Sequence, residues 1–147
     1  MYGHHALVMA YARFTTELPV RPDDIDMNNH LHGSKYLDYV LFARYDQMAR
    51  CYGMPMEDFL KSGWNWYQKE FHIEFKRAVT LADRVLVRTW IDSFEKSDVK
   101  VGFQMFKKEP NKLAADGYFV SSLIDVKTGK AIPIPGSVIE HYTRHRE

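Results

Sequence analysis

A carboxylate and a helix start lie close together around the polar stretch of residues 22–33. Asp26 comes seven residues before Gly33, and Ser34 can cap the helix that follows. A helix start carries free backbone N–H groups and a partial positive charge, and glycine lets a substrate approach the backbone closely. Such donors could stabilise an oxyanion on a carbonyl that Asp26, or a water activated by Asp26, attacks. A solvated acidic loop with a helix cap is the alternative, and the residue types alone leave both open.

Two histidines lie in the same loop. His30 and His32 form a His-x-His pair near three aspartates, and imidazole with carboxylate suits zinc. No third and fourth ligand follow at a recognisable spacing, so we expect no metal. We expect the histidines to hydrogen-bond within the loop, with His30 helping to orient Asp26.

A strand before this loop and a long helix after it must position these residues. Residues 12–21 alternate imperfectly and contain β-branched side chains, which predicts a strand. Residues 34–52 carry a broad apolar face at helical spacing, and Gly53 can end that helix in a left-handed conformation. Residues 55–62 predict a short second helix.

The rest of the chain predicts strands, near residues 64–77, 83–94, 98–108 and 114–127. They follow one another through short connections, so we expect an antiparallel, four-stranded meander. One apolar helix packed against one face of a strongly curved sheet gives two layers and the α+β class. No repeat or linker interrupts the pattern, and a length of 147 residues predicts a single domain, residues 1–147.

Several motifs of this sequence occur in the order of a known family. Asp24, Asp26, His30, Tyr36 and the Ala43-Arg44 pair fall in register with its first signature. Segments beginning at Phe71, Glu95 and Thr128 are similar to its later ones. The sequence therefore resembles the 4-hydroxybenzoyl-CoA thioesterase family of hotdog-fold proteins over about residues 12–140.

The resemblance implies a hotdog fold, in which a long central helix is wrapped by a curved antiparallel five-stranded sheet. It implies hydrolysis of an acyl-CoA or acyl carrier protein thioester to the free acid and thiol. Asp26 matches the catalytic carboxylate, as nucleophile or general base. Gly33 matches the position whose N–H polarises the thioester carbonyl, and Tyr36 matches an aromatic that lines the acyl site. Asn29 and His32-Gly33 depart from the usual glycine and Asn-Asn pair.

Further residues are candidates for binding the substrate. Ser34 lies at the helix start beside Gly33, and Trp66 belongs to an aromatic cluster that could line the acyl site or a dimer core. Two local basic sites could meet the phosphates of coenzyme A, or could be ordinary solvated strand ends. They are Lys76-Arg77 and Lys96-Ser97.

Arg44 and Cys51 lie on the apolar face of the long helix. A buried guanidinium must be paired, and we expect a salt bridge to a loop aspartate such as Asp24 or to a dimer partner, rather than a substrate contact. No neighbouring base supports catalysis by Cys51, so we expect it to be a core residue.

Composition narrows the class of protein. The net charge of +1 gives no broad electrostatic reason to bind nucleic acid. The single cysteine excludes an internal disulfide and suits a reducing compartment. No apolar run approaches the ~18 residues of a membrane-spanning helix, and residues 1–5 do not resemble a signal peptide. We therefore expect a cytoplasmic protein without membrane insertion.

The resemblance also implies a homodimer, which can pair further into a homotetramer, and no cofactor, since coenzyme A enters as part of the substrate. Two rival functions remain open at this point. One is a hotdog dehydratase acting on hydroxyacyl thioesters, and the other is a non-catalytic acyl-thioester binding protein.

Overall fold

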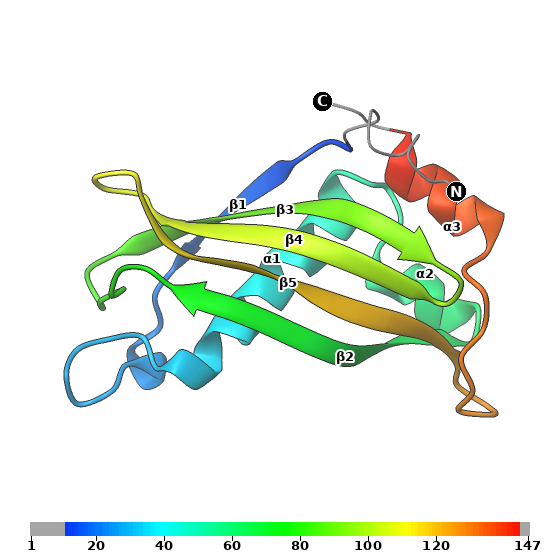
Figure 1. Ribbon diagram of the computed structural model, residues 1–147, viewed down its shortest axis with the longest axis horizontal. Coiled ribbons are helices and arrows are strands. Elements are labelled where there is room, and N and C mark those ends of the chain that lie inside the picture. Colours follow the sequence, from blue (N-terminus) through cyan, green and yellow to red (C-terminus); the bar gives the residue numbers. More distant parts are fainter. Residues whose placement is uncertain (1–10, 145–147) are drawn as a thin grey trace.

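The computed structural model describes residues 11–144 and contains one sheet and one long helix (Figure 1). The strands and helices follow in chain order: β1 (Phe14–Pro19), the 3-10 turns η2 (Pro22–Asp24) and η3 (Gly33–Lys35), α1 (Tyr36–Arg50), α2 (Met56–Lys61), β2 (Trp64–Phe75), β3 (Arg84–Glu95), β4 (Asp98–Lys107), β5 (Lys112–Asp125) and α3 (Gly136–Thr143). Residues 1–5, from which we argued against a signal peptide, lie outside the described residues.

The five strands form one antiparallel sheet in the order β1-β3-β4-β5-β2. The predicted four-stranded meander is therefore wrong in one pairing, because β2 pairs with β5 and not with β3. The connections from β3 to β4 and from β4 to β5 have two and four residues, whereas residues 76–83 connect β2 to β3. This longer segment carries the chain across the sheet and leaves β2 as an edge strand.

Helix α1 lies across one face of the sheet, and Figure 1 shows the strands curving around it. The helix buries one side against alternating sheet residues, so that Val40 and Ala43 meet a core that contains Val87, Phe103 and Met105. Gly53, with a φ of 72°, ends the helical segment as predicted. The predicted α+β architecture, a long helix wrapped by a curved five-stranded sheet, is confirmed.

Helix α3 is an element that the sequence patterns did not predict. Pro135 precedes it in an extended conformation, and Val138 and Tyr142 point into the core. The Tyr142 ring stacks on Tyr52, with centroids 4.6 Å apart and planes 9° apart. This helix thereby closes the end of the sheet beyond the C-terminus of α1.

Within residues 11–144, no helix has the length and apolar character needed to span a bilayer. Cys51 is a free, half-buried cysteine packed against the core, and burial raises the pKa of its thiol. A raised thiol pKa agrees with a core residue rather than a nucleophile.

Candidate active site

The loop between β1 and α1 is a compact hairpin-like turn that presents Asp26. Ile25 forms an antiparallel bridge with Leu31, and the Asp26 N–H donates to the carbonyl of His30 at 2.9 Å. Asn29 makes the sharp reversal with a φ of 61°, in the left-handed region that asparagine tolerates better than most residues. Asn29 replaces the glycine of the family signature, and the two residue types suit the same backbone conformation.

The Asp26 carboxylate is fixed by backbone donors of its own loop. Its Oδ1 accepts hydrogen bonds from the N–H of Asn28 at 2.9 Å and of His30 at 3.1 Å. These two bonds, that from His30 first, lower the pKa of Asp26 below its usual value. The predicted orienting role of His30 is thus performed by its backbone amide. Oδ2 receives no hydrogen bond from the described residues and remains available for chemistry.

The buried carboxylate residue Asp24 holds this loop in place through hydrogen bonds. Asp24 is 8% exposed, and its Oδ2 accepts a 2.8 Å hydrogen bond from the hydroxyl of Tyr39. Its backbone carbonyl accepts from the N–H of His32 at 2.9 Å. The predicted pairing of Asp24 with Arg44 is therefore wrong, because the loop holds Asp24 at the N-terminal end of α1, beside Tyr39 and the Arg21 guanidinium.

The helix start differs in one detail from the sequence prediction. Gly33–Lys35 form a 3-10 turn, and α1 proper begins at Tyr36. The ring Nδ1 of His32 accepts from the Ser34 N–H at 3.1 Å and lies 2.8 Å from the Ser34 hydroxyl. His32 is therefore the cap, and the prediction that Ser34 fills this role is wrong. The Gly33 N–H has no acceptor among the described residues.

Six of the predicted site residues line one open hollow of about 350 Å³, which we call the Asp26 hollow. It brings together Asp26, His30, Gly33, Tyr36, Lys76 and Arg77. Asp26 and Gly33, whose N–H has no acceptor among the described residues, therefore line the same space, with two basic residues beside them.

The walls of the Asp26 hollow are ordered by contacts with the end of β2. The ring of Tyr36 packs edge-on against Phe75, with centroids 4.9 Å apart. Lys76 Nζ lies 3.0 Å from the Glu74 carboxylate, and Arg77 Nη1 donates to the Leu113 carbonyl at 2.8 Å. Each basic side chain is exposed and keeps donors free for an anionic ligand.

Three predicted residues lie at the opposite end of the sheet. Trp66 is near the start of β2, and its ring packs 5.4 Å from that of Phe59. Lys96 and Ser97 form the turn between β3 and β4, where their carbonyls accept from backbone N–H groups. One chain therefore does not bring these residues to the Asp26 hollow, because the length of β2 separates the two ends.

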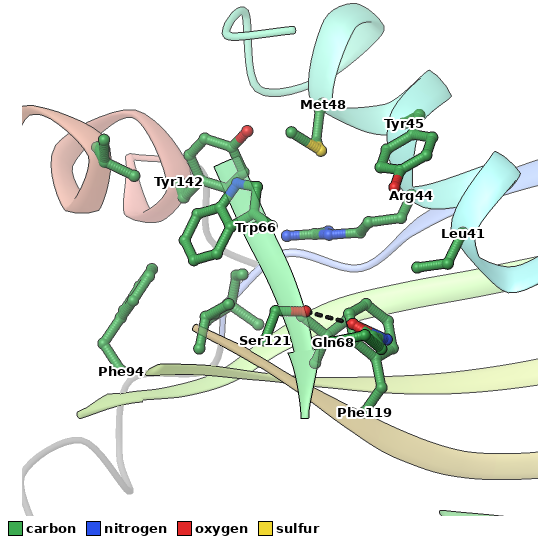
Figure 2. Close-up of a pocket in the computed structure, with 14 residues that line it drawn as sticks. Leu41, Arg44, Tyr45, Met48, Trp66, Gln68, Phe94, Phe119, Ser121 and Tyr142 are labelled. Carbon is green, nitrogen blue, oxygen red and sulfur yellow. Dashed lines mark hydrogen bonds between the residues drawn. The ribbon is translucent and has the colours of Figure 1, made fainter. Parts of the chain in front are cut away.

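A second space lies at that opposite end, between α1, the sheet and α3 (Figure 2). We call it the Arg44 cavity. It has a volume of about 90 Å³, and its walls are mostly apolar. Arg44 reaches into it from α1, and the Gln68–Ser121 pair lies on the sheet side. Sequence reasoning placed Arg44 on the buried face of the helix but did not find this cavity or Gln68.

Arg44 is held by a chain of neutral groups rather than by an acid. Its Nη1 donates to the hydroxyls of Tyr52 at 3.1 Å and Thr89 at 3.2 Å. The chain continues from Thr89 to the side chain of Gln47, which is fully buried and donates to Thr16 Oγ1 at 3.0 Å.

The far end of this chain reaches the protein surface. The Thr16 hydroxyl donates to Asp46 Oδ2 at 2.6 Å, and Asp46 is paired with Arg50 at 2.8 Å. Each group in the chain donates in the same direction, from Arg44 towards Asp46. Gln47 was not predicted to be buried, although its spacing of three residues from Arg44 places both on one helix face.

Metal ligands do not gather in the described part of the chain, where no group of three or more His, Cys, Asp or Glu side chains could hold an ion. His30 and His32 are both exposed, and the His32 ring is engaged with Ser34.

A five-stranded antiparallel sheet that curves around one long helix is the hotdog fold. Residues 20–141 match the Thioesterase-like superfamily, and the chain belongs to this superfamily. The prediction of an enzyme of the acyl-CoA thioesterase class is thereby confirmed. No curated protein matches the sequence.

Solved structures share the fold at low sequence identity. The chain is similar to a DHNA-CoA thioesterase from Staphylococcus aureus, with a TM-score of 0.83 and 21% identity over 90% of this chain and 89% of that one. It is also similar to a 1,4-dihydroxy-2-naphthoyl-CoA thioesterase from Synechocystis, with a TM-score of 0.80 and 17% identity over 89% and 96%. A Staphylococcus aureus protein solved in complex with CoA is similar with a TM-score of 0.79 and 19% identity, over 95% of this chain and 89% of that one.

Proposed function

We propose that the protein hydrolyses an acyl-CoA thioester in the Asp26 hollow. The observation that supports this most directly is the arrangement of two groups. The Asp26 carboxylate is fixed through Oδ1 with no partner on Oδ2 in residues 11–144, and Gly33, whose N–H has no acceptor there, lines the same hollow. A base or nucleophile and an oxyanion donor are the two parts that acyl transfer needs.

In the proposed reaction the thioester carbonyl oxygen accepts a hydrogen bond from the Gly33 N–H. A water attacks the carbonyl carbon while its proton moves to Asp26 Oδ2, and the negative charge that forms on oxygen is stabilised at the helix start. The C–S bond then breaks, and the proton passes to the leaving thiolate. Asp26 could instead attack the carbonyl itself and form an anhydride that water opens. Neither path uses a cofactor, because coenzyme A is part of the substrate.

The basic residues support coenzyme A as the carrier. Lys76 and Arg77 line the Asp26 hollow and are exposed, as phosphate-binding side chains need to be. One of the similar structures was solved with CoA. The finer assignment to the 4-hydroxybenzoyl-CoA thioesterase family rests on the signature around Asp26. The rings of Tyr36 and Phe75 line the Asp26 hollow, and they suit aryl or medium-chain acyl groups.

The edge strand supports a homodimer. β2 is 12 residues long and pairs on one side only within the described chain. Tyr67 is 61% exposed on it, and a long edge strand with an exposed aromatic residue is a template for pairing with another copy. In an antiparallel β2–β2 pair the Trp66 end of one copy lies beside the Phe75 end of the other. The residues that one chain keeps apart, Trp66, Lys96 and Ser97, would then approach the partner's Asp26 hollow.

The single free Cys51 is compatible with a cytoplasmic location.

Free thiol release from a panel of aryl, short-, medium- and long-chain acyl-CoAs tests this proposal. Replacing Asp26 with Asn should lower kcat by orders of magnitude, because the amide can neither attack nor accept the proton. Asp23→Asn is the matched control, since Asp23 is an exposed acid of the same loop that pairs with Arg21.

Other outcomes would redirect the assignment. Activity unchanged by Asp26→Asn would move the chemistry to another residue, with His30 tested next. Binding of acyl-CoA without thiol release would favour a binding protein, and hydration of an enoyl-CoA would favour a dehydratase. A single turnover in heavy-oxygen water would leave the label in Asp26 only if this carboxylate is the nucleophile. Comparison with acyl carrier protein thioesters tests the carrier.

A further inference from the structure

The Arg44 cavity contains a buried cation whose donors are only partly used. Arg44 is 5% exposed, and a guanidinium carries five N–H donors in a fixed fork. Nη1 uses its two donors on the hydroxyls of Tyr52 and Thr89. Nη2 and Nε have no acceptor among the described residues, and no described carboxylate forms an ion pair with this side chain. The free edge of the fork is the edge that binds a carboxylate in bidentate fashion.

A second donor of the same cavity is also unused. The Ser121 hydroxyl donates to Gln68 Oε1 at 2.5 Å, which fixes the amide (Figure 2). The amide nitrogen of Gln68 is buried and has no partner within residues 11–144. Buried donors without a partner are rare in native structures, so the presence of this one beside a partly unpaired guanidinium needs an explanation.

We propose that the Arg44 cavity binds the carboxylate of an organic acid with a short apolar body, through Arg44 and Gln68. One carboxylate balances the single positive charge of Arg44, whereas a phosphate dianion would bring an uncompensated charge into an apolar site. Leu41, Met48 and Phe119 line the cavity and suit methylene groups. The cavity has a volume of about 90 Å³ and is partly open, so the carboxylate and the first carbons lie inside it while a longer chain extends out of it.

Tryptophan fluorescence offers a direct measurement, because Trp66 lines the cavity. Titration with hexanoate should change the emission saturably, and Trp66→Phe should remove most of the signal. Hexanamide has the same shape without the charge and should bind about 10- to 100-fold more weakly, the difference expected for hydrogen bonds to a charged group.

Two variants test the assigned donors. Arg44→Met and Gln68→Leu should each weaken hexanoate binding, Arg44→Met by the larger factor. Arg88→Met and Gln104→Leu are matched controls that should bind hexanoate like the wild type, because Arg88 packs on Phe106 and Gln104 lines a different hollow. If Arg44→Met does not fold, as judged by near-UV circular dichroism, Gln68→Leu still decides. Equal binding of hexanoate and hexanamide, no saturable signal, or unchanged affinity in Gln68→Leu would overturn the proposal.

The carboxylate could belong to a free acid or to the far end of an acyl chain whose thioester lies in the partner's Asp26 hollow across the β2–β2 pair, and the second source rests on the proposed function and its dimer. Comparing kcat/KM for adipoyl-CoA and hexanoyl-CoA separates them. A preference for adipoyl-CoA that Gln68→Leu abolishes assigns the carboxylate to the acyl group, whereas an unaltered ratio with lost hexanoate binding assigns it to a free acid. If no acyl-CoA of the aryl, short-, medium- and long-chain panel is cleaved but hexanoate binds, the proposed function fails while the carboxylate site stands.

Discussion

The hydroxyl of Tyr39 donates a 2.8 Å hydrogen bond to the carboxylate of Asp24 beneath the loop that presents Asp26. Tyr39 Oη also accepts from the Arg21 N–H at 2.9 Å, and burial raises the pKa of this tyrosine to about 12. The phenol therefore stays protonated at any physiological pH. Since Asp24 in turn holds the backbone of His32, this pair fixes both ends of the site loop.

Replacing Tyr39 with Phe should destabilise the protein by about 1–3 kcal/mol, because the Asp24 carboxylate stays buried and loses its donor. Urea unfolding followed by circular dichroism measures the change in the free energy of unfolding. Tyr45→Phe is the control, because Tyr45 is 45% exposed and the loss of its hydroxyl should change stability by less than about 0.5 kcal/mol. Equal stability of the two variants would show that the Tyr39–Asp24 bond does not anchor the loop.

The proposed oxyanion donor can be removed without disturbing the backbone. Gly33→Pro deletes the N–H at the first position of a helical turn, where proline is favoured, and His32 already has the extended conformation that precedes proline. We expect kcat to fall about 10²- to 10³-fold. Gly33→Ala keeps the N–H, and its added Cβ would make an ordinary 3.7 Å contact with Phe75. The alanine variant should therefore lose much less activity, and equal losses in both would argue against the N–H.

The pH dependence of hydrolysis should follow the lowered pKa of Asp26. A base must be ionised, and a depressed pKa keeps it so down to acidic pH; activity is lost as pH falls through the pKa of the folded state. The ordinary pKa of an aspartate is 3.8, and that of Asp26 is lower. We therefore expect protonation of Asp26 to cause no loss of kcat/KM between neutral pH and pH 3.8, and to lower kcat/KM only at more acidic pH. A loss of activity that begins well above pH 3.8 would instead argue against Asp26 as the base.

Sedimentation tests the proposed dimer. The wild type should sediment at twice the mass of the 17.3 kDa chain, or at four times if dimers pair. Tyr67→Asp should shift it towards the monomer, because a charge on an edge strand opposes pairing. Asp replacing the exposed Leu60 of α2 is the control and should leave the mass unchanged. A monomeric wild type would contradict the dimer.

Local patterns in the sequence identified most elements. The helix expected at 34–52 is found at Tyr36–Arg50, and the strand expected at 83–94 is found at Arg84–Glu95. The gathering of Asp26 and Gly33 in one hollow was also expected, because both lie in one short stretch joined to a helix start. Periodicity and turn residues are local signals, and these features depend on local structure.

Long-range relationships were harder to predict. The pairing of β2 with β5 depends on where residues 76–83 lead the chain, which periodicity does not encode. Arg44 was expected to meet an acid and instead donates to Thr89, a residue 45 positions away on β3. Helix α3 is short, and Val138, Ile139 and Tyr142 in helical spacing were its only apolar signal.

The hydrogen-bond chain that starts at Arg44 also has a mechanical consequence. It joins α1 to β3 through Thr89 and to β1 through Thr16, inside an interface that is otherwise apolar. Apolar side chains tolerate small displacements, whereas a directed series of hydrogen bonds is broken by a slide of one helical turn. The hydrogen-bond chain therefore fixes the position of α1 along the sheet.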